Sequence, residues 1–393
     1  MSAAQQQHIS VVFDIDSASI GVAVVGYSNE QRLPQREYFS KRVQLNTNRP
    51  FEDFFAKTIK TLETLGHEAV NHAPNNINDI YLGLSVPWVS SQKRVVEYDE
   101  KGKTFTFTKE HAQELINKEL SEPLLKNLDY HHYSDLEIFE RRTVDIYLNG
   151  YPSLYPFRGL TPVKDVHIHS ITSVISATTK QAFVHAIERV FNKEPVLISN
   201  TIVQYMALKT FIPDENDAMI IDMGGTNTQV FVVHDDHLTE IASFPVGREH
   251  VVDEVMKRAQ VSNNKARSLI SLFTSHSLDQ EYQQQLSSIM SDAYHVWMKP
   301  WFELCDTLSA KKLLPSTLCI TAPDDISSWL RYHILATDEL MEHIHSSQKL
   351  QVIDISLFLG SLADDMNMEH LSDAEMIPLI DVVGSLIQER TTT

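Results

Sequence analysis

The stretch AMIIDMGGTNTQVFVV, residues Ala218 to Val233, decides the fold. A short apolar run ends in Asp222, two glycines follow, and a β-rich run begins after three small polar residues. Apolar runs on both sides of a glycine-containing turn predict two strands joined as a hairpin. Gly224 and Gly225 allow positive φ, so successive N–H groups of the turn are expected to point at one anion, such as a phosphate.

The polar residues of this hairpin extend the prediction to a nucleotide. Asp222 ends the first strand beside the turn, where its carboxylate is placed to hold Mg²⁺ directly or through water. The alternative is an ordinary tight hairpin with a capping aspartate. The nucleotide-binding residues predicted in this hairpin are Asp222, Gly224, Gly225, Thr226, Asn227 and Thr228.

A second hairpin of the same kind lies near the N-terminus, in ISVVFDIDSASIGVAVV, Ile9 to Val25. It repeats the order of apolar strand, aspartate, small-residue turn and strand, with Asp14 in the place of Asp222. Two such hairpins far apart in sequence predict a duplicated domain whose turns face each other and hold opposite ends of a triphosphate. From this copy we predict Asp14, Ser17 and Ser19 as nucleotide-binding residues, with Asp14 as a second Mg²⁺ ligand.

Composition excludes several classes of function. The chain has 52 acidic and 33 basic residues among 393, so nucleic acid is not an expected partner. It contains no apolar run of about 18 residues, so no transmembrane helix is predicted. The first ten residues do not resemble a secretory signal. The two cysteines, Cys305 and Cys319, form no CxxC motif, which fits a reducing cytoplasm.

The order of predicted strands and helices indicates an α/β protein with an insertion. Strands and helices alternate in residues 1–86 and again in 176–213, and we assign both to a first domain. Residues 87–175 have a different pattern of strands around one helix, and their length suits a small α+β subdomain. Residues 214–393, which begin just before the glycine hairpin, form the predicted second domain.

These motifs together resemble the bacterial actin-like ATPases, in the group that contains the cell-division protein FtsA and the type IV pilus assembly protein PilM. The resemblance is carried by VFDIDSASIGVAVV and IIDMGGTNTQVFVV as the two phosphate loops, by VDIYLNGYPSLYPFRGL and VHIHSITSVIS in the insertion, and by SFPVGREHVVDEV after the second hairpin. It implies an α/β, actin-like fold, which is the duplicated two-domain fold related to ribonuclease H, with an inserted small α+β subdomain. It also implies ATP and Mg²⁺ in the cleft and, at most, a weak ATPase.

The same resemblance implies a scaffold or assembly protein on the cytoplasmic face of a membrane, in type IV pilus biogenesis or cell division. FtsA-like members bind the tail of FtsZ, and PilM-like members bind a cytoplasmic peptide of the membrane protein PilN. Self-association into filaments or dimers is also implied. The C-terminal AEMIPLIDVVGSLIQER is similar to the helix that closes the fold in PilM. No basic amphipathic segment follows it, so direct membrane insertion is not expected.

Four residues depart from the pattern of this group. Asp16 stands where a glycine is usual, so a second carboxylate would face the phosphates. Asn200 stands where relatives often have an acidic residue, and an amide is no general base. Ala322 and Pro323 replace a pair of glycines expected near the adenosine, and the proline ring fills space and lacks an N–H.

Three functions are therefore open. The first is an ATP-binding scaffold that recruits a membrane-associated machine. The second is an adaptor of the same fold that has lost its nucleotide. The third is a sugar or carboxylate kinase, because DMGGTN resembles the phosphate loop of glucokinase-type enzymes, although those proteins carry it at the N-terminus.

Overall fold

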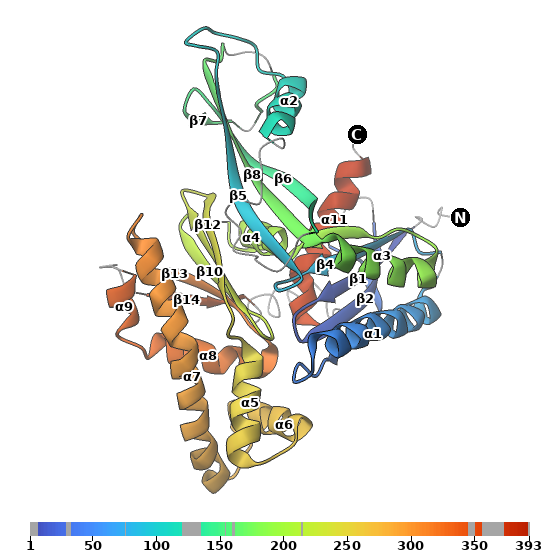
Figure 1. Cartoon of the computed structure of the whole chain (residues 1–393), viewed down its shortest axis with the longest axis vertical. Coiled ribbons are helices and arrows are strands. Elements are labelled where there is room, and N and C mark those ends of the chain that lie inside the picture. Colours follow the sequence, from blue (N-terminus) through green and yellow to red (C-terminus); the bar gives the residue numbers. More distant parts are fainter. Residues whose placement is uncertain are drawn as a thin grey trace. The chain divides into compact units, whose positions relative to one another are not determined.

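The computed structural model describes residues 7–28, 33–74, 76–119, 135–153, 155–158, 162–213, 215–344, 350–355 and 373–391. The chain divides into two compact units (Figure 1). The main unit comprises Met1–Trp88 and Thr179–Thr393, and the inserted unit comprises Val89–Thr178. Among the described helices, none is long and apolar enough to span a membrane.

The main unit contains two five-stranded sheets with the same strand order. In each sheet an antiparallel meander of three strands is followed by two parallel strands. This repeat confirms the duplicated α/β architecture predicted from the two hairpins. In spatial order the first sheet is β3 (Arg36–Gln44), β2 (Ser19–Tyr27), β1 (His8–Ile15), β4 (Asp79–Leu84) and β9 (Val196–Ser199), and the second is β12 (His237–Phe244), β11 (Thr228–His234), β10 (Ala218–Met223), β13 (Thr317–Thr321) and β14 (Gln351–Asp354).

Helices cover both faces of the first sheet. Side chains alternate between the faces of a strand, so neighbouring residues of β1 enter different parts of the core. Val12 packs in a cluster with the C-terminal helix, whereas the ring of Phe13 meets the edge of Phe191 on the other face. The helices concerned are α1 (Phe51–His72), α3 (Ala177–Phe191), α4 (Asn200–Phe211) and α11 (Ile377–Thr391).

The position of α11 corrects one predicted domain boundary. The sequence assigned 214–393 to the second domain, but α11 packs on the first sheet, where Leu379 and Ile380 join its core. The Tyr27 hydroxyl donates a hydrogen bond of 2.8 Å to the carbonyl of Ile380. The apolar residues of α11 complete the face that β1, β2 and β4 leave open, so the chain returns to its first domain at the end.

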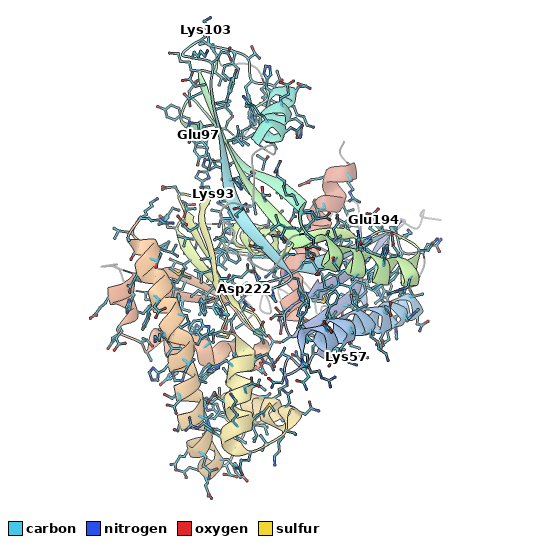
Figure 2. The ribbon with its side chains drawn as sticks, in the orientation of Figure 1. Lys57, Lys93, Glu97, Lys103, Glu194 and Asp222 are labelled. Carbon is cyan, nitrogen blue, oxygen red and sulfur yellow. The ribbon has the colours of Figure 1, made fainter. Side chains whose placement is uncertain are left out.

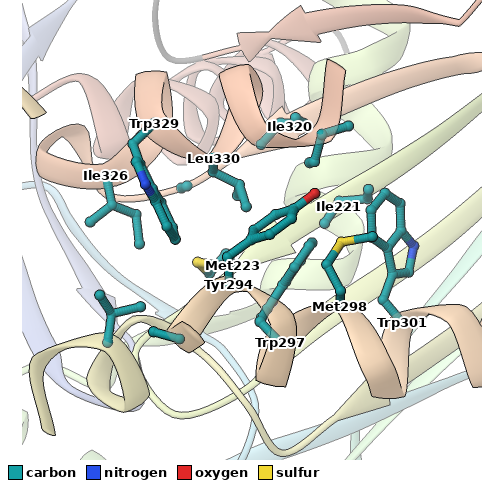
Figure 3. Packing of buried hydrophobic residues seen from close by; sticks show 14 of the residues in the cluster. Ile221, Met223, Tyr294, Trp297, Met298, Trp301, Ile320, Ile326, Trp329 and Leu330 are labelled. Atoms are coloured by element: carbon teal, nitrogen blue, oxygen red, sulfur yellow. The ribbon is translucent and has the colours of Figure 1, made fainter. Parts of the chain in front are cut away.

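The second sheet is covered on one face by a larger core (Figure 3). Trp297 and Trp301 of α7 pack one helical turn apart, with ring centroids separated by 5.1 Å, and Trp329 meets Tyr294 edge to face. Each such buried side chain contributes about 1.5 to 3 kcal/mol through removal of apolar area from water. The helices that supply this core are α5 (Arg248–Ala259), α6 (Asn263–Thr274), α7 (Gln280–Ser309), α8 (Asp324–Leu335) and α9 (Leu340–His343).

The inserted unit is a four-stranded antiparallel sheet with one described helix, α2 (Lys109–Glu119). Its core gathers Phe107, Val166 and Ile168 with residues of α2. Outside these strands, Phe105 makes an isolated bridge to Val163. In spatial order the strands are β5 (Val89–Asp99), β8 (Asp165–Ser176), β6 (Leu136–Leu148) and β7 (Tyr151–Pro152).

Candidate functional site

The two hairpin turns meet inside the main unit. The turn between β1 and β2 and the turn between β10 and β11 are joined by two hydrogen bonds. The Gly225 N–H donates to Oδ2 of Asp16 at 3.0 Å, and the Thr226 N–H donates to Oγ of Ser17 at 2.8 Å. Residues more than 200 positions apart therefore lie in direct contact, and the first turn supplies the acceptors for backbone donors of the second.

The glycines of the second turn are needed for close approach. A Cβ atom built on Gly225 would lie 2.2 Å from Cβ of Ala18, and one on Gly224 would lie 2.8 Å from Oδ1 of Asp16. Neither glycine has positive φ. The sequence analysis therefore explained these glycines wrongly, since it expected them to allow a left-handed turn. No side chain fits between the turns at these positions.

Helix α5 holds the second turn from the opposite side. Its first two N–H groups, of Arg248 and Glu249, donate to the carbonyl oxygens of Gly224 and Gly225 at 3.0 and 2.8 Å. A Cβ on Gly247, which precedes α5, would lie 2.5 Å from one of these carbonyl oxygens. The free N–H groups at a helix start are a common anion site, and here the chain satisfies these two itself.

Asp14 has an arginine partner that the sequence analysis missed. The guanidinium of Arg42, on β3, lies 2.9 Å from Asp14, 2.9 Å from Asp373 and 3.3 Å from Glu375, and it also donates to Ser19 at 3.0 Å. Burial raises the pKa of Asp14, and the charge of Arg42 opposes that rise. Burial raises the pKa of Glu375 to about 7. Arg42 thus ties the first hairpin to the segment that leads into α11.

Asp222 lies near the end of β10 (Figure 2). Its carboxylate is held by neutral donors. Asn200 and Gln204, one turn apart on α4, donate to it at 2.6 and 3.5 Å, and the Thr321 hydroxyl donates at 2.7 Å. Burial raises the pKa of Asp222 to about 7, and the negative charges of Asp16 and Asp14 add to the rise. Asn200, noted as a departure in the sequence, is therefore a hydrogen-bond partner of the carboxylate.

The carboxylates line a small cavity of about 70 Å³. Asp14, Asp16, Asp222 and Glu375 all contribute to its wall, and among the residues that the structure describes no lysine, arginine or histidine does. Ala322 and Pro323 form part of the same wall, together with residues of α4 and α11. Ligand pockets usually measure about 300 to 1,000 Å³, so this cavity is too small and too acidic for a triphosphate.

A larger cavity of about 590 Å³ lies beside the first. Arg248 and Arg267 line it, and both donate to Oε1 of Gln44, at 3.2 and 3.3 Å. Arg248 is also paired with Asp325, and Arg267 with Glu249. The sequence analysis did not single out Arg248, because two of its partners, Gln44 and Asp325, lie 204 and 77 positions away.

The remaining predicted site residues have partners within the chain. The Thr226 hydroxyl donates to Oδ1 of Asn227 at 2.7 Å, and the Gly224 N–H donates to the Asn227 carbonyl at 2.9 Å. Thr228 is fully buried, donates to the Val246 carbonyl and accepts from the indole of Trp297. The prediction that Thr228 binds nucleotide is therefore not supported, since its hydroxyl is used inside the core.

Magnesium and ATP do not fit this closed arrangement. The amide groups of the glycine turn already donate to Asp16 and Ser17, so no phosphate reaches them unless the two turns separate. Asp14 is paired with Arg42. Among the described residues, no group of three or more histidine, cysteine, aspartate or glutamate side chains could hold a metal ion. Binding of ATP with Mg²⁺ would require a different position of the first turn.

Comparison with known proteins identifies the fold. No family model matches the sequence, and no curated protein matches it significantly. The structure is similar to that of a chain in the PilM–PilN type IV pilus biogenesis complex, with a TM-score of 0.60 and 10% identity over 95% of this chain and 98% of that chain. The chain has the actin-like fold. The PilM-like side of the predicted resemblance is thus supported at the level of the fold.

Two further structures are similar at lower scores. The ethanolamine utilization protein EutJ from Carboxydothermus hydrogenoformans has a TM-score of 0.45 and 10% identity over 90% of this chain and 86% of that chain. A protein of unknown function with an actin-like ATPase fold from Bacteroides thetaiotaomicron has a TM-score of 0.43 and 9% identity over 97% of this chain and 98% of that chain. The assignment of the fold rests on the first comparison, and the resemblance to FtsA stays a prediction.

Proposed function

We propose that this protein is an actin-like scaffold that recruits a membrane-associated machine, and that it binds a short cytoplasmic peptide of a membrane protein. The proposal is supported by the fold, which is similar to that of a chain in a complex between PilM and PilN. Under this proposal, the protein lies at the inner face of a membrane and is held there by its partner. A pilus-type machine is the first expectation, and a partner with an FtsZ-like tail or a second copy of this chain is the alternative.

The observation that carries the proposal is the composition of the small cavity. Four carboxylates line it, and its backbone donors are already bonded within the chain. A phosphotransferase needs positive charge or metal to position phosphates, together with a base for the attacking group. Asp222 is held by Asn200 and Thr321, and its pKa of about 7 belongs to a buried carboxyl. The geometry therefore favours binding over catalysis, and among the three open functions it favours the adaptor.

We assign the domains in this proposal as residues 1–86 with 176–213 for the first actin-like domain, 87–175 for the inserted subdomain and 214–355 for the second. The segment from 373 returns to the first domain, in line with the packing of α11. The inserted subdomain is then a compact unit of its own.

A scaffold that uses ATP is the second candidate. The cavity beside Arg248 and Arg267 favours it, because its volume of about 590 Å³ is in the range of ligand pockets. In that form, ATP and Mg²⁺ would enter only after Asp16 and Ser17 leave the glycine turn. Weak ATP hydrolysis would belong to this candidate alone.

The test is purification of the full-length protein with its partners from native membranes, followed by titration of the recovered membrane protein's cytoplasmic segment as a synthetic peptide. The Asp222→Ala variant serves as the matched control for the cavity. We expect saturable peptide binding that is equal for the wild type and Asp222→Ala. Transfer of phosphate from ATP to a panel of sugars and carboxylic acids, lost in Asp222→Ala, would establish the kinase and exclude the scaffold.

A further inference from the structure

We propose that Asp16 and Ser17 form an internal latch, in which the chain's own carboxylate occupies the backbone donors that the glycine turn otherwise offers to an anion. The latch consists of Asp16 and Ser17 on one side and the N–H groups of Gly225 and Thr226 on the other. The closed form of the main unit is then held by the protein itself and needs no nucleotide.

One of the two bonds of the latch is charge-assisted. The Asp16 bond joins an N–H donor to a carboxylate, and such charge-assisted bonds are about twice as strong as neutral ones. The Ser17 hydroxyl accepts from the Thr226 N–H at 2.8 Å and donates to Oδ1 of Asp16 at 3.3 Å. This hydroxyl therefore links the Thr226 N–H to the Asp16 carboxylate. In the closed form the two turns approach closely at Ala18 and Gly225, where a Cβ built on Gly225 would lie 2.2 Å from that of Ala18.

Helix α5 strengthens the latch from behind. Its N-terminal N–H groups polarise the peptide groups of Gly224 and Gly225 by donating to their carbonyl oxygens. The N–H of Gly225 is thereby a better donor toward Asp16. The positive end of the α5 dipole thus acts on the Asp16 carboxylate through the peptide group that joins Gly224 to Gly225, and its sign favours an anion at this position.

Contacts outside the second turn hold the first turn in place. The indole N–H of Trp88 donates to the Asp16 carbonyl at 3.0 Å. Trp88 stacks on Phe54 with centroids 5.8 Å apart and meets the edge of Phe183 at 5.5 Å. Within the turn itself, the Asp16 N–H donates to the carbonyl of Ser19. A rigid acceptor loses little conformational entropy when the latch closes, so the closed form is favoured.

The latch also explains why glycine residues occur here without positive φ. Any side chain at Gly224 or Gly225 would push Asp16 or Ala18 away. Removal of the Asp16 side chain should leave the Gly225 N–H in place, still supported by α5 but without an acceptor, whereas the Thr226 N–H keeps Oγ of Ser17. The variant Asp16→Gly is therefore expected to acquire an anion site that the wild type lacks.

Amide hydrogen exchange of the full-length protein tests the latch directly. We expect slow exchange at Gly225 and Thr226 in the wild type. Asp16→Ala should accelerate exchange at Gly225 by about ten- to a hundredfold, and Ser17→Ala should accelerate Thr226 by about two- to tenfold. Asp16→Asn keeps an oxygen acceptor and should restore most of the protection. Asp338→Ala, which changes an exposed aspartate in another turn of the main unit, is the matched control and should have no effect.

Titration with inorganic phosphate, and separately with an ATP analogue and Mg²⁺, gives the second readout. We expect no saturable binding to the wild type and saturable phosphate binding to Asp16→Gly. The latch is overturned if Gly225 and Thr226 exchange freely in the wild type, or if Asp16→Ala and Ser17→Ala leave exchange at these two amides as slow as in the wild type. It is also overturned if phosphate or the ATP analogue slows exchange at these amides in the wild type, or if Asp16→Gly binds no phosphate. Neither readout uses a membrane partner, so this proposal and the scaffold function fail separately.

Discussion

The turn between β1 and β2 and the turn between β10 and β11 occupy the same place in two sheets of the same strand order, yet they do opposite chemistry. The first turn offers side-chain acceptors, Asp16 and Ser17. The second offers backbone donors, at Gly225 and Thr226. A duplication that began with two alike halves would place like groups against each other, and here the halves are complementary.

The strand-end aspartates differ in the same way. Asp14 is neutralised by the guanidinium of Arg42, whereas Asp222 is surrounded by the neutral donors Asn200, Gln204 and Thr321. One half of the repeat therefore carries an ion pair and the other half a carboxyl with a pKa of about 7. The carboxylate at the end of the first strand of the hairpin is therefore stabilised by an opposite charge in one domain and by neutral hydrogen-bond donors in the other.

The largest effect is expected when the ion pairs of the first half are removed. The Arg42→Met variant leaves Asp14, Asp373 and Glu375 without their cation, and a buried carboxylate that loses its partner costs about 3 to 5 kcal/mol of unfolding free energy. Urea denaturation at pH 8 measures this loss. The loss should shrink at pH 5, because burial raises the pKa of Glu375 to about 7 and the carboxyl is then protonated.

Lys41→Met is the matched control for this variant. Lys41 precedes Arg42 on β3 and pairs with Glu68 at the surface, where its side chain is 45% exposed. Exposed pairs of this kind contribute less than about 1 kcal/mol. Equal losses for Arg42→Met and Lys41→Met would show that the buried carboxylates do not depend on the arginine.

A smaller effect, of the opposite sign, is expected in the second half. The amide of Asp222→Asn can accept from Asn200 and donate to Thr321, so it keeps these two hydrogen bonds, loses only the 3.5 Å contact with Gln204, and cannot ionise. The folded pKa of Asp222 is about 7 and the unfolded value is about 4, so its contribution to wild-type stability is present at low pH and is lost as pH rises toward 7.

The variant should therefore gain stability over the wild type as pH rises. We expect the gain to grow by about 2 kcal/mol between about pH 5 and pH 8, after allowance for the partial exposure of the side chain. Denaturation curves for both proteins at each pH measure it. Asp338→Asn, at an exposed position, should show no such trend, and a flat difference for Asp222→Asn would contradict the raised pKa.

The sequence predicted the repeated hairpins because the information is local. An apolar strand, an aspartate at its end and a small-residue turn determine pairing within about 16 residues, and the observed registers, Ile15 with Ile20 and Met223 with Thr228, follow from that pattern. The duplication followed from two copies of this one local signal.

The chemistry of the site could not be predicted in the same way. Arg42 and its partner Asp373 are 331 positions apart and meet only because α11 returns to the first sheet. The two glycines carried an ambiguous signal, since glycine serves both positive φ and close approach, and only the position of Ala18 against Gly225 shows which one applies. The local pattern of residues predicted the strands and hairpins. The chemistry of the site depends on contacts between elements that are distant in the sequence, so the local pattern could not predict it.

The smallest effect is expected at Trp88, whose indole supports the first turn. Trp88→Phe removes the indole N–H that donates to the Asp16 carbonyl and should cost about 1 kcal/mol more than the same substitution at Trp329. The two side chains are buried alike, 6% and 7% exposed, but the indole N–H of Trp329 has no partner among the described residues, so Trp329→Phe breaks no hydrogen bond and removes an unpaired donor. Guanidinium denaturation of the two variants isolates the hydrogen bond. Equal losses would mean that the first turn is positioned by packing, and the complementarity of the two turns would then not depend on a fixed Asp16.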